Sequence, residues 1–223
     1  MRRAAAVVVA LAALVAGVIA GVNAAGASAG AATSTTSVAT EFQAAVASTL
    51  AAGAVHGESF LDGARNLVED FRGPSEARAV LYVDGGDPAE IRSVDGWRYF
   101  PDDKHPGKWI ACAVEATEAS KTPGTFVTTV EVLPDVASVK RLRSGLYEFR
   151  MPEAPPAGIS ASAWSGLAGT RGTAKVRDGR ITEVKQFVPL SGKQMLFRTT
   201  FRYDDVARTK APAERDITSR TCS

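Results

Sequence analysis

Residue types that most often carry chemistry are scarce in this sequence, which has two histidines and two cysteines among 223 residues. Residues 37–223 contain no phosphate-binding loop, no G-x-G-x-x-G, no C-x-x-C and no G-x-S-x-G pattern. Trp164-Ser165-Gly166 lacks the upstream glycine of a nucleophile elbow. We therefore expect no catalytic residue, no metal site and no cofactor, and interpret the chain as a binding protein rather than an enzyme.

An excess of charge of one sign is also missing. The chain has 26 Lys and Arg against 24 Asp and Glu, and Arg2 and Arg3 belong to a segment that looks removable, which leaves 24 against 24. Nucleic-acid binders and peripheral membrane proteins gain affinity from clustered Lys and Arg. We therefore expect no nucleic-acid partner and only transient membrane contact. With 45% hydrophobic residues the chain is typical of a globular protein, which we expect to be a monomer.

Residues 1–29 have the features of a cleaved secretory signal. Arg2 and Arg3 precede an apolar run over residues 4–20, and small residues at 25–27 and 27–29 satisfy the cleavage pattern. An uncleaved membrane anchor is the alternative, although the run is short and rich in alanine. No cysteine lies near the end of the run, which excludes lipid attachment there. We expect a secreted or cell-envelope location, outside the cytoplasm.

The two cysteines, Cys112 and Cys222, agree with export. Two thiols in one small exported domain usually pair, and this bridge would fasten the C-terminal tail. A free buried thiol at Cys112 or a reactive thiol at Cys222 are the alternatives. The sequence therefore predicts a Cys112–Cys222 disulfide.

Residues 30–36 are small and polar enough to form a flexible linker, and we expect one domain over residues 37–223. Apolar residues recur every four positions from Val38 to Leu50, which predicts an amphipathic helix. A second helix is predicted over residues 59–72, because Ser59 to Asp62 fits a capping signal and Gly73-Pro74 would end it. His56 would then lie between the two helices.

After Pro74 the apolar period changes from four to two, which indicates strands. Asp95-Gly96 and Asp178-Gly179 each separate two strand-like runs and predict tight hairpins, and residues 193–203 alternate most clearly. Residues 125–133 could form a strand or a short helix, and residues 159–167 a short helix. With eight to ten strands, we expect an α+β fold in which a curved antiparallel half-barrel sheet wraps over one or two N-terminal helices.

Several strand segments resemble those of a known family. The segments that carry the resemblance are Val94-Asp95-Gly96-Trp97-Arg98-Tyr99 with Gly107-Lys108-Trp109, Gly145-Leu146-Tyr147-Glu148-Phe149, Val176-Arg177-Asp178-Gly179-Arg180-Ile181, and Phe201 to Val206 followed by Lys210-Ala211-Pro212. In this order, over residues 90–212, they resemble the LolA-like lipoprotein-carrier superfamily and its actinobacterial LppX/LprG-type branch.

The resemblance implies an open half-barrel whose helices fill the concave face, and a cavity that binds an acyl chain, a lipid or a lipidated protein. The sequence departs from the branch in two respects. It lacks the lipobox cysteine, and its predicted second helix occupies the region where the family often begins its sheet.

The apolar and aromatic faces of the predicted strands are the candidate ligand surface, and a plain hydrophobic core is the alternative reading of the same residues. The candidate cavity-lining residues are Trp97, Tyr99, Trp109, Phe149, Met151, Phe187, Met195, Phe197 and Phe201.

Two rival functions stay open. One is an exported protein-interaction or sensor domain that binds no small molecule. The other is an enzyme or metal site at Asp102, Asp103 and His105, which the sequence also reads as a solvated loop.

Overall fold

A computed structural model of the chain describes residues 37–73, 75–82, 86–114, 130, 132–156, 161–190 and 192–220. The predicted signal peptide and linker at residues 1–36 lie outside the described residues, as do Cys222 and most of the ambiguous segment 125–133.

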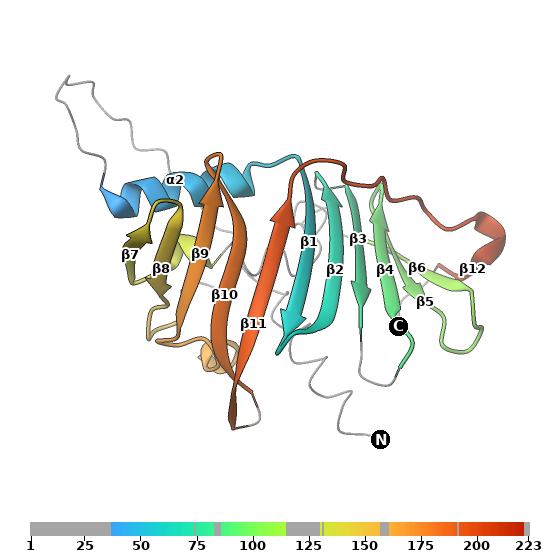
Figure 1. Cartoon of the computed structure of the whole chain (residues 1–223). Coiled ribbons are helices and arrows are strands. Elements are labelled where there is room, and N and C mark those ends of the chain that lie inside the picture. The colour runs from blue at the N-terminus through green and yellow to red at the C-terminus, as the bar shows by residue number, and fades with distance from the viewer. Residues whose placement is uncertain are drawn as a thin grey trace.

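The described residues form twelve strands, two α-helices and two short 3-10 helices (Figure 1). The helices are α2 (Val38–Leu50), α5 (Ala161–Trp164), η2 (Leu133–Asp135) and η3 (Glu214–Asp216). The strands are β1 (Ala54–Leu61), β2 (Ala64–Arg72), β3 (Glu76–Leu81), β4 (Ala89–Val94), β5 (Trp97–Pro101), β6 (Trp109–Ala113), β7 (Ser138–Arg143), β8 (Leu146–Arg150), β9 (Arg171–Arg177), β10 (Arg180–Leu190), β11 (Lys193–Arg202) and β12 (Ile217–Ser219).

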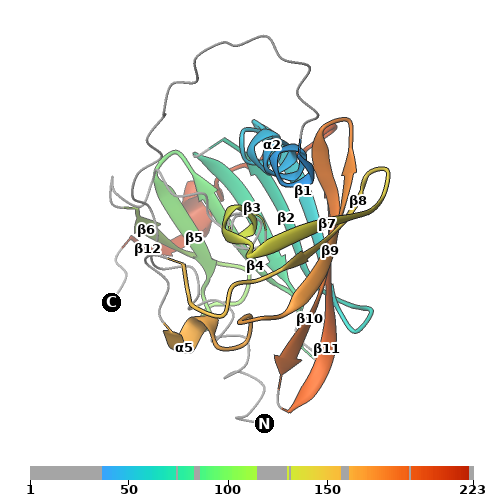
Figure 2. The same cartoon turned by 90° about the vertical axis from the view of Figure 1, so that its left-hand side faces the viewer.

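All twelve strands belong to one sheet, in the order β12-β6-β5-β4-β3-β2-β1-β11-β10-β9-β8-β7. Every neighbouring pair is antiparallel except β12 and β6, which run parallel. The sheet is strongly curved and does not close, since β12 and β7 form its two edges (Figure 2). The expected α+β architecture with an open, curved sheet is confirmed.

Helix α2 lies against the concave side of the sheet. Its first turn is capped by Ser37, whose hydroxyl accepts a hydrogen bond from the Thr40 N–H at 3.1 Å. Its buried face contributes Phe42 and Val46 to the main hydrophobic core. An ion pair between Glu41 and Arg141 of β7 connects the helix to the sheet. The predicted helix from Val38 to Leu50 is therefore confirmed and covers the β7–β10 half of the sheet, with which it makes most of its contacts.

The predicted second helix over residues 59–72 is wrong, because this segment forms the end of β1, a turn and β2. Asp62 and Gly63 form the turn with φ angles of 47° and 85°, a left-handed conformation that a helix interior excludes. His56 accordingly lies within β1 and not between helices. The helix was predicted in place of β2 because five successive residues, 67 to 71, are buried, so apolar and polar residues do not alternate along this strand.

Both hairpins predicted at Asp-Gly pairs are confirmed, joining β4 to β5 and β9 to β10. At 95–96 and at 178–179 both residues again have positive φ. The short helix expected within residues 159–167 is present as α5. Twelve strands exceed the eight to ten expected, and β1, β2 and β12 are the strands that the sequence pattern did not predict.

The hydrophobic core lies between the concave face and the segments that cover it. Phe42 of α2 packs on Tyr147 and Phe149 of β8, with ring centroids 5.6 and 6.3 Å apart. Leu133 of η2 and Trp164 of α5 are each 1% exposed and belong to the same cluster. The core therefore fills the part of the concave face nearest α2.

Candidate functional site

Beyond this core, an apolar row crosses the concave face on seven successive strands. It consists of one residue from each of β11, β1, β2, β3, β4, β5 and β6, namely Phe197, Leu61, Leu67, Leu81, Ile91, Phe100 and Ile110. We call this set the concave row. At the usual spacing of neighbouring strands it is about 30 Å wide.

Strand register places these side chains on one face. Phe197 lies opposite Leu61, Leu67 lies opposite Leu81, and Phe100 lies opposite Ile110. Directly paired residues in a sheet point to the same side, as do residues two or four apart along one strand.

The row shares its face with the core. Phe197 is four residues from Phe201, and Leu67 is four residues from Phe71, both of which belong to the core cluster. Leu61 and Leu81 are the last residues of β1 and β3, which point downward in Figure 1, away from α2. The concave row therefore continues the core along the sheet, at the ends of the strands away from the helix.

The concave row differs from the core in exposure. Leu67 is buried, but the other six members are only partly buried. Between row and core on β1 and β11, Ser59 and Thr199 are buried and share a hydrogen bond of 3.0 Å. Glu69 of β2 is also buried on this face, between Leu67 and Phe71. The members of the row are themselves all apolar and are suited to the hydrocarbon part of a ligand.

The nine predicted cavity-lining residues lie on two opposite faces of the sheet. Phe149, Met151 and Phe201 are buried in the core, and Met195 and Phe197 are partly buried on the concave face. The other four point to the convex face. Tyr99 is the register partner of Arg92, and Phe187 that of Leu196, and both partners are on the convex side. The four convex residues are Trp97, Tyr99, Trp109 and Phe187. Whether any of the nine contacts a ligand stays a prediction.

Aromatic residues on the convex face near β5 and β6 are covered by the chain's own arginines. The Arg92 guanidinium lies 4.7 Å from the ring centroid of Trp109, and that of Arg220 lies 5.0 Å from the ring centroid of Trp97. Tyr99 is 5% exposed. Phe187 differs from these three, because its side chain is 57% exposed.

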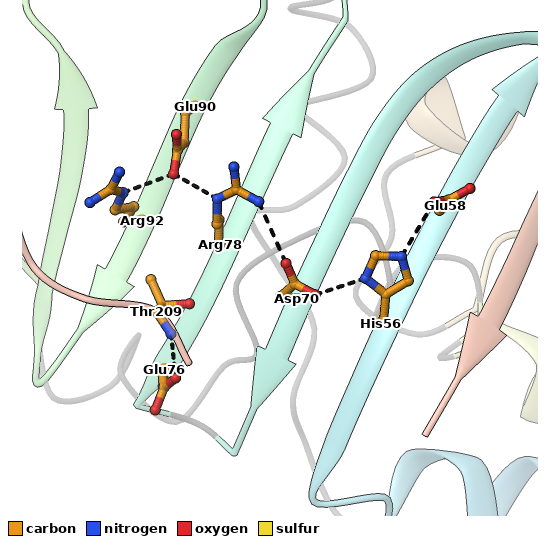
Figure 3. A network of polar contacts seen from close by, with 8 residues as sticks. All are labelled: His56, Glu58, Asp70, Glu76, Arg78, Glu90, Arg92 and Thr209. Carbon is orange, nitrogen blue, oxygen red and sulfur yellow. Dashed lines mark hydrogen bonds and ion pairs between the residues drawn. The ribbon is translucent and has the colours of Figure 1, made fainter. Parts of the chain in front are cut away.

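A chain of charged side chains crosses β1 to β4 on the convex face (Figure 3). His56 Nδ1 lies 2.8 Å from Asp70 Oδ1, and Arg78 lies between the carboxylates of Asp70 and Glu90. The Nε nitrogens of Arg78 and Arg92 both donate to Glu90 Oε1, at 2.7 and 2.8 Å.

This network also holds the C-terminal segment, since Glu76 accepts a hydrogen bond from the Thr209 N–H and Arg92 donates to the Lys210 carbonyl. The charges therefore serve to fasten that segment across the convex face.

The electrostatics of the network follow from these pairings. Partial burial raises the pKa of Glu90, but hydrogen bonds from Arg78 and Arg92 outweigh it and keep that pKa below its ordinary value. The hydrogen bond with Glu90 raises the pKa of Arg78. His56 has carboxylates on both sides, with Glu58 Oε1 at 3.4 Å from its Nε2. Both ring nitrogens of His56 are therefore engaged in contacts with carboxylates of neighbouring residues.

The Asp102–His105 pair forms a turn rather than a metal site. Asp102 accepts hydrogen bonds from the Lys104 N–H at 2.9 Å and from the Thr218 hydroxyl, and lies 2.8 Å from His105 Nδ1. The bonds from Thr218 and His105 lower the pKa of Asp102 to about 2. Within the described residues, no group of three or more His, Cys, Asp or Glu side chains is arranged to hold a metal ion.

Among the helices of the described part of the chain, none combines the length and the hydrophobicity needed to cross a membrane. Cys112 lies on β6, while Cys222 lies outside the described residues, so the predicted disulfide stays a prediction.

Comparison with solved structures gives a structural likeness. The fold is similar to the crystal structure of the lipoprotein LppX of Mycobacterium tuberculosis, with a TM-score of 0.47 and 11% sequence identity, over 76% of this chain and 96% of LppX. Neither a family model nor a curated protein sequence matches the chain. Membership of the LolA-like superfamily and of its LppX/LprG-type branch therefore stays a prediction.

Proposed function

We propose that this protein is an extracytoplasmic, non-enzymatic carrier that binds the hydrocarbon part of a lipid, an acyl chain or a lipidated protein on the concave row. The observation that carries this proposal is the partial exposure of six apolar side chains, contributed by β1, β3, β4, β5, β6 and β11. A surface of this kind, continuous with the core and far wider than one side chain, is suited to an extended apolar ligand.

The expected driving force is burial of hydrocarbon. At about 25 cal/mol per Å², a ligand that removes roughly 300 Å² of apolar surface from water gains about 7–8 kcal/mol before the entropic cost of binding. The convex face is a poor alternative for such a ligand, because its central strands carry the His56–Asp70–Arg78 charge network. The concave row is therefore the surface on which we expect an acyl chain to lie.

Native mass spectrometry of protein purified from an exporting host tests the proposal first. A carrier is expected to show additional mass that disappears under denaturing conditions and extracts as lipid. A bare mass, together with no uptake of an added fluorescent fatty acid, would contradict the proposal and favour an exported interaction domain without a small ligand.

A matched pair of substitutions tests the location. Phe197→Glu places a charge in the concave row, whereas Phe187→Glu places the same charge on the opposite face of the neighbouring strand, at a side chain that is already 57% exposed. We expect Phe197→Glu to lose fatty-acid uptake and Phe187→Glu to retain it. Thermal melting of both variants confirms that they fold. Equal uptake by the two folded variants would exclude the concave row as the site.

A further inference from the structure

A groove of about 1140 Å³ opens at the end of the sheet next to α2, on the upper side of Figure 1. It lies between three neighbouring stretches: the β7–β8 turn, the β9–β10 hairpin and the end of β11. Its lining residues include five with basic side chains, namely Arg143, Lys175, Arg177, Arg180 and Arg202. Only two acidic residues, Asp178 and Asp204, line it.

The arginines of this groove differ from Arg198 and from the arginines of the convex charge network. Elsewhere, Arg78, Arg92 and Arg198 each donate to a glutamate at 2.7–2.8 Å. Within the described part of the chain, by contrast, none of the four groove arginines forms an ion pair with a carboxylate. Lys175 is the exception among the basic groove residues, since its Nζ lies 2.8 Å from Glu183 Oε1.

Local structure keeps these charges available. The Arg180 guanidinium lies 5.1 Å from the ring centroid of Tyr203, whose hydroxyl donates to the Ile181 carbonyl. Burial is the main cause that raises the pKa of Tyr203 to about 12. The phenol therefore stays neutral at physiological pH and does not provide a negative charge for Arg180. Asp178 has a left-handed φ of 51° in the hairpin turn, which accounts for an aspartate at that position. Asp178 and Asp204 offset part of the charge, so the groove keeps an excess of basic side chains in which the four arginines have no ion-pair partner among the described residues.

Unpaired guanidinium groups favour an external oxyanion, above all phosphate, which they bind with paired hydrogen bonds. Two exposed leucines lie next to residues at this end of the sheet, outside the lining of the groove. Leu142, which precedes Arg143, is 45% exposed. Leu50 is 38% exposed. Leu50 lies close to Arg180, because the hydroxyl of the preceding residue, Thr49, accepts a hydrogen bond from the Ile181 N–H at 2.9 Å. Apolar side chains beside arginines match a membrane surface, where phosphates lie directly above hydrocarbon.

We propose that this end of the sheet is a docking surface for the phosphates of anionic membrane lipids, formed by Arg143, Arg177, Arg180 and Arg202 with Leu50 and Leu142. We call the four arginines the arginine rim. Docking would hold the carrier at a membrane reversibly, without an anchor. The proposal goes beyond the carrier function, because the rim can bind lipid headgroups whether or not the concave row binds an acyl chain.

Vesicle co-sedimentation tests the rim with the protein purified from an exporting host. We expect binding to vesicles of phosphatidylcholine mixed with phosphatidylglycerol, weakening as salt increases, and little binding to phosphatidylcholine alone. The double variant Arg177→Gln/Arg202→Gln is expected to bind about thirtyfold more weakly, at roughly 1 kcal/mol per basic residue near the surface.

The control is Arg171→Gln/Lys193→Gln, which removes the same charge at the other ends of β9 and β11, about 20–30 Å away. It is expected to bind like the unmodified protein. Equal losses in both double variants would show a net-charge effect and overturn the rim. Absence of binding to the anionic vesicles would also overturn it. Calorimetry with inorganic phosphate adds a third arm, in which binding as tight as that to vesicles would indicate a free-phosphate site instead of a docking surface.

Discussion

Phe149 of β8 packs directly over Gly172 of β9, its partner in the strand register. A Cβ atom at position 172 would lie 2.3 Å from Cζ of the ring and 2.7 Å from the Lys185 carbonyl oxygen. Phe149 is 1% exposed and also packs against Phe42 of α2. This ring therefore connects the helix to the sheet through a position that only glycine can occupy without displacing backbone.

Gly172→Ala is therefore expected to destabilise the protein by about 1–3 kcal/mol, as over-packing of a core does. Urea unfolding, followed by circular dichroism, measures the effect. Gly53→Ala is the matched control, since a Cβ there would meet nothing within 4 Å. Equal midpoints for the two variants would contradict the packing described.

Phe201 and Phe197 face the same way on β11 but should respond differently to truncation. Phe201 is 3% exposed within the core, so Phe201→Ala is expected to cost about 3–5 kcal/mol of unfolding free energy. Phe197 is only partly buried in the concave row, and Phe197→Ala should cost clearly less stability while weakening fatty-acid uptake. A loss of stability at Phe197 as large as that at Phe201 would show that the row is core rather than binding surface.

The attachment of β12 is expected to depend on pH through Asp102. Hydrogen bonds from Thr218 and His105 lower the pKa of this carboxyl from an ordinary 3.8 to about 2. A lowered carboxyl pKa stabilises the fold above the ordinary value, and this contribution is lost as pH falls from about 4 towards 2. The protection of the amides at residues 217–219 against hydrogen exchange, measured relative to the intrinsic rate at each pH, should therefore fall over that interval.

Asp102→Asn separates this effect from general acid unfolding. The variant should show lower protection at residues 217–219 already at neutral pH, and this protection, relative to the intrinsic exchange rate, should respond little to acidification between pH 4 and 2. A pH response of these residues that is unchanged in the variant would exclude Asp102 as its cause.

The predicted Cys112–Cys222 disulfide fits the direction of β12. Ile217 lies opposite Trp109 and Ser219 opposite Ile110, so the parallel strand runs in the direction of Cys112. A denatured mass two hydrogens below that of the reduced chain would establish the bridge. Cys112→Ser/Cys222→Ser is expected to lose up to about 4–5 kcal/mol of stability, because the bridge would close a loop of more than a hundred residues. An unchanged mass on reduction would contradict the prediction.

Much of the fold was accessible from sequence because tight turns have local causes. Asp95-Gly96 and Asp178-Gly179 predicted two hairpins correctly, and the four-residue period of α2 predicted the helix. Asp62-Gly63 is a third pair of the same kind and forms the same type of turn. It was missed because the strand after it is buried on both faces and mimics a helical stripe. The Asp62-Gly63 turn signal is therefore a better indicator of β1 and β2 than the apolar stripe of residues 60–71.

The candidate site was less accessible, since alternation within a strand does not show which set of residues faces the concave side. Phe197 and Trp97 were both predicted to line one cavity, but Phe197 lies on the concave face and Trp97 on the convex face, under Arg220. Five members of the concave row are single aliphatic residues, each on a different strand, and only the register across seven strands brings them together. Net charge likewise concealed the arginine rim, because a neutral chain can still place several arginines without ion-pair partners at one end of its sheet.

The most direct test of the concave row is photolabelling with a fatty acid that carries a diazirine on its hydrocarbon chain, read out by mass spectrometry at single residues. Our account predicts that labels fall on members of the row such as Phe197, Ile91 and Phe100, and that excess unlabelled fatty acid suppresses them. Labels concentrated on Phe187 and the convex face, or labelling that the competitor leaves unchanged, would contradict it.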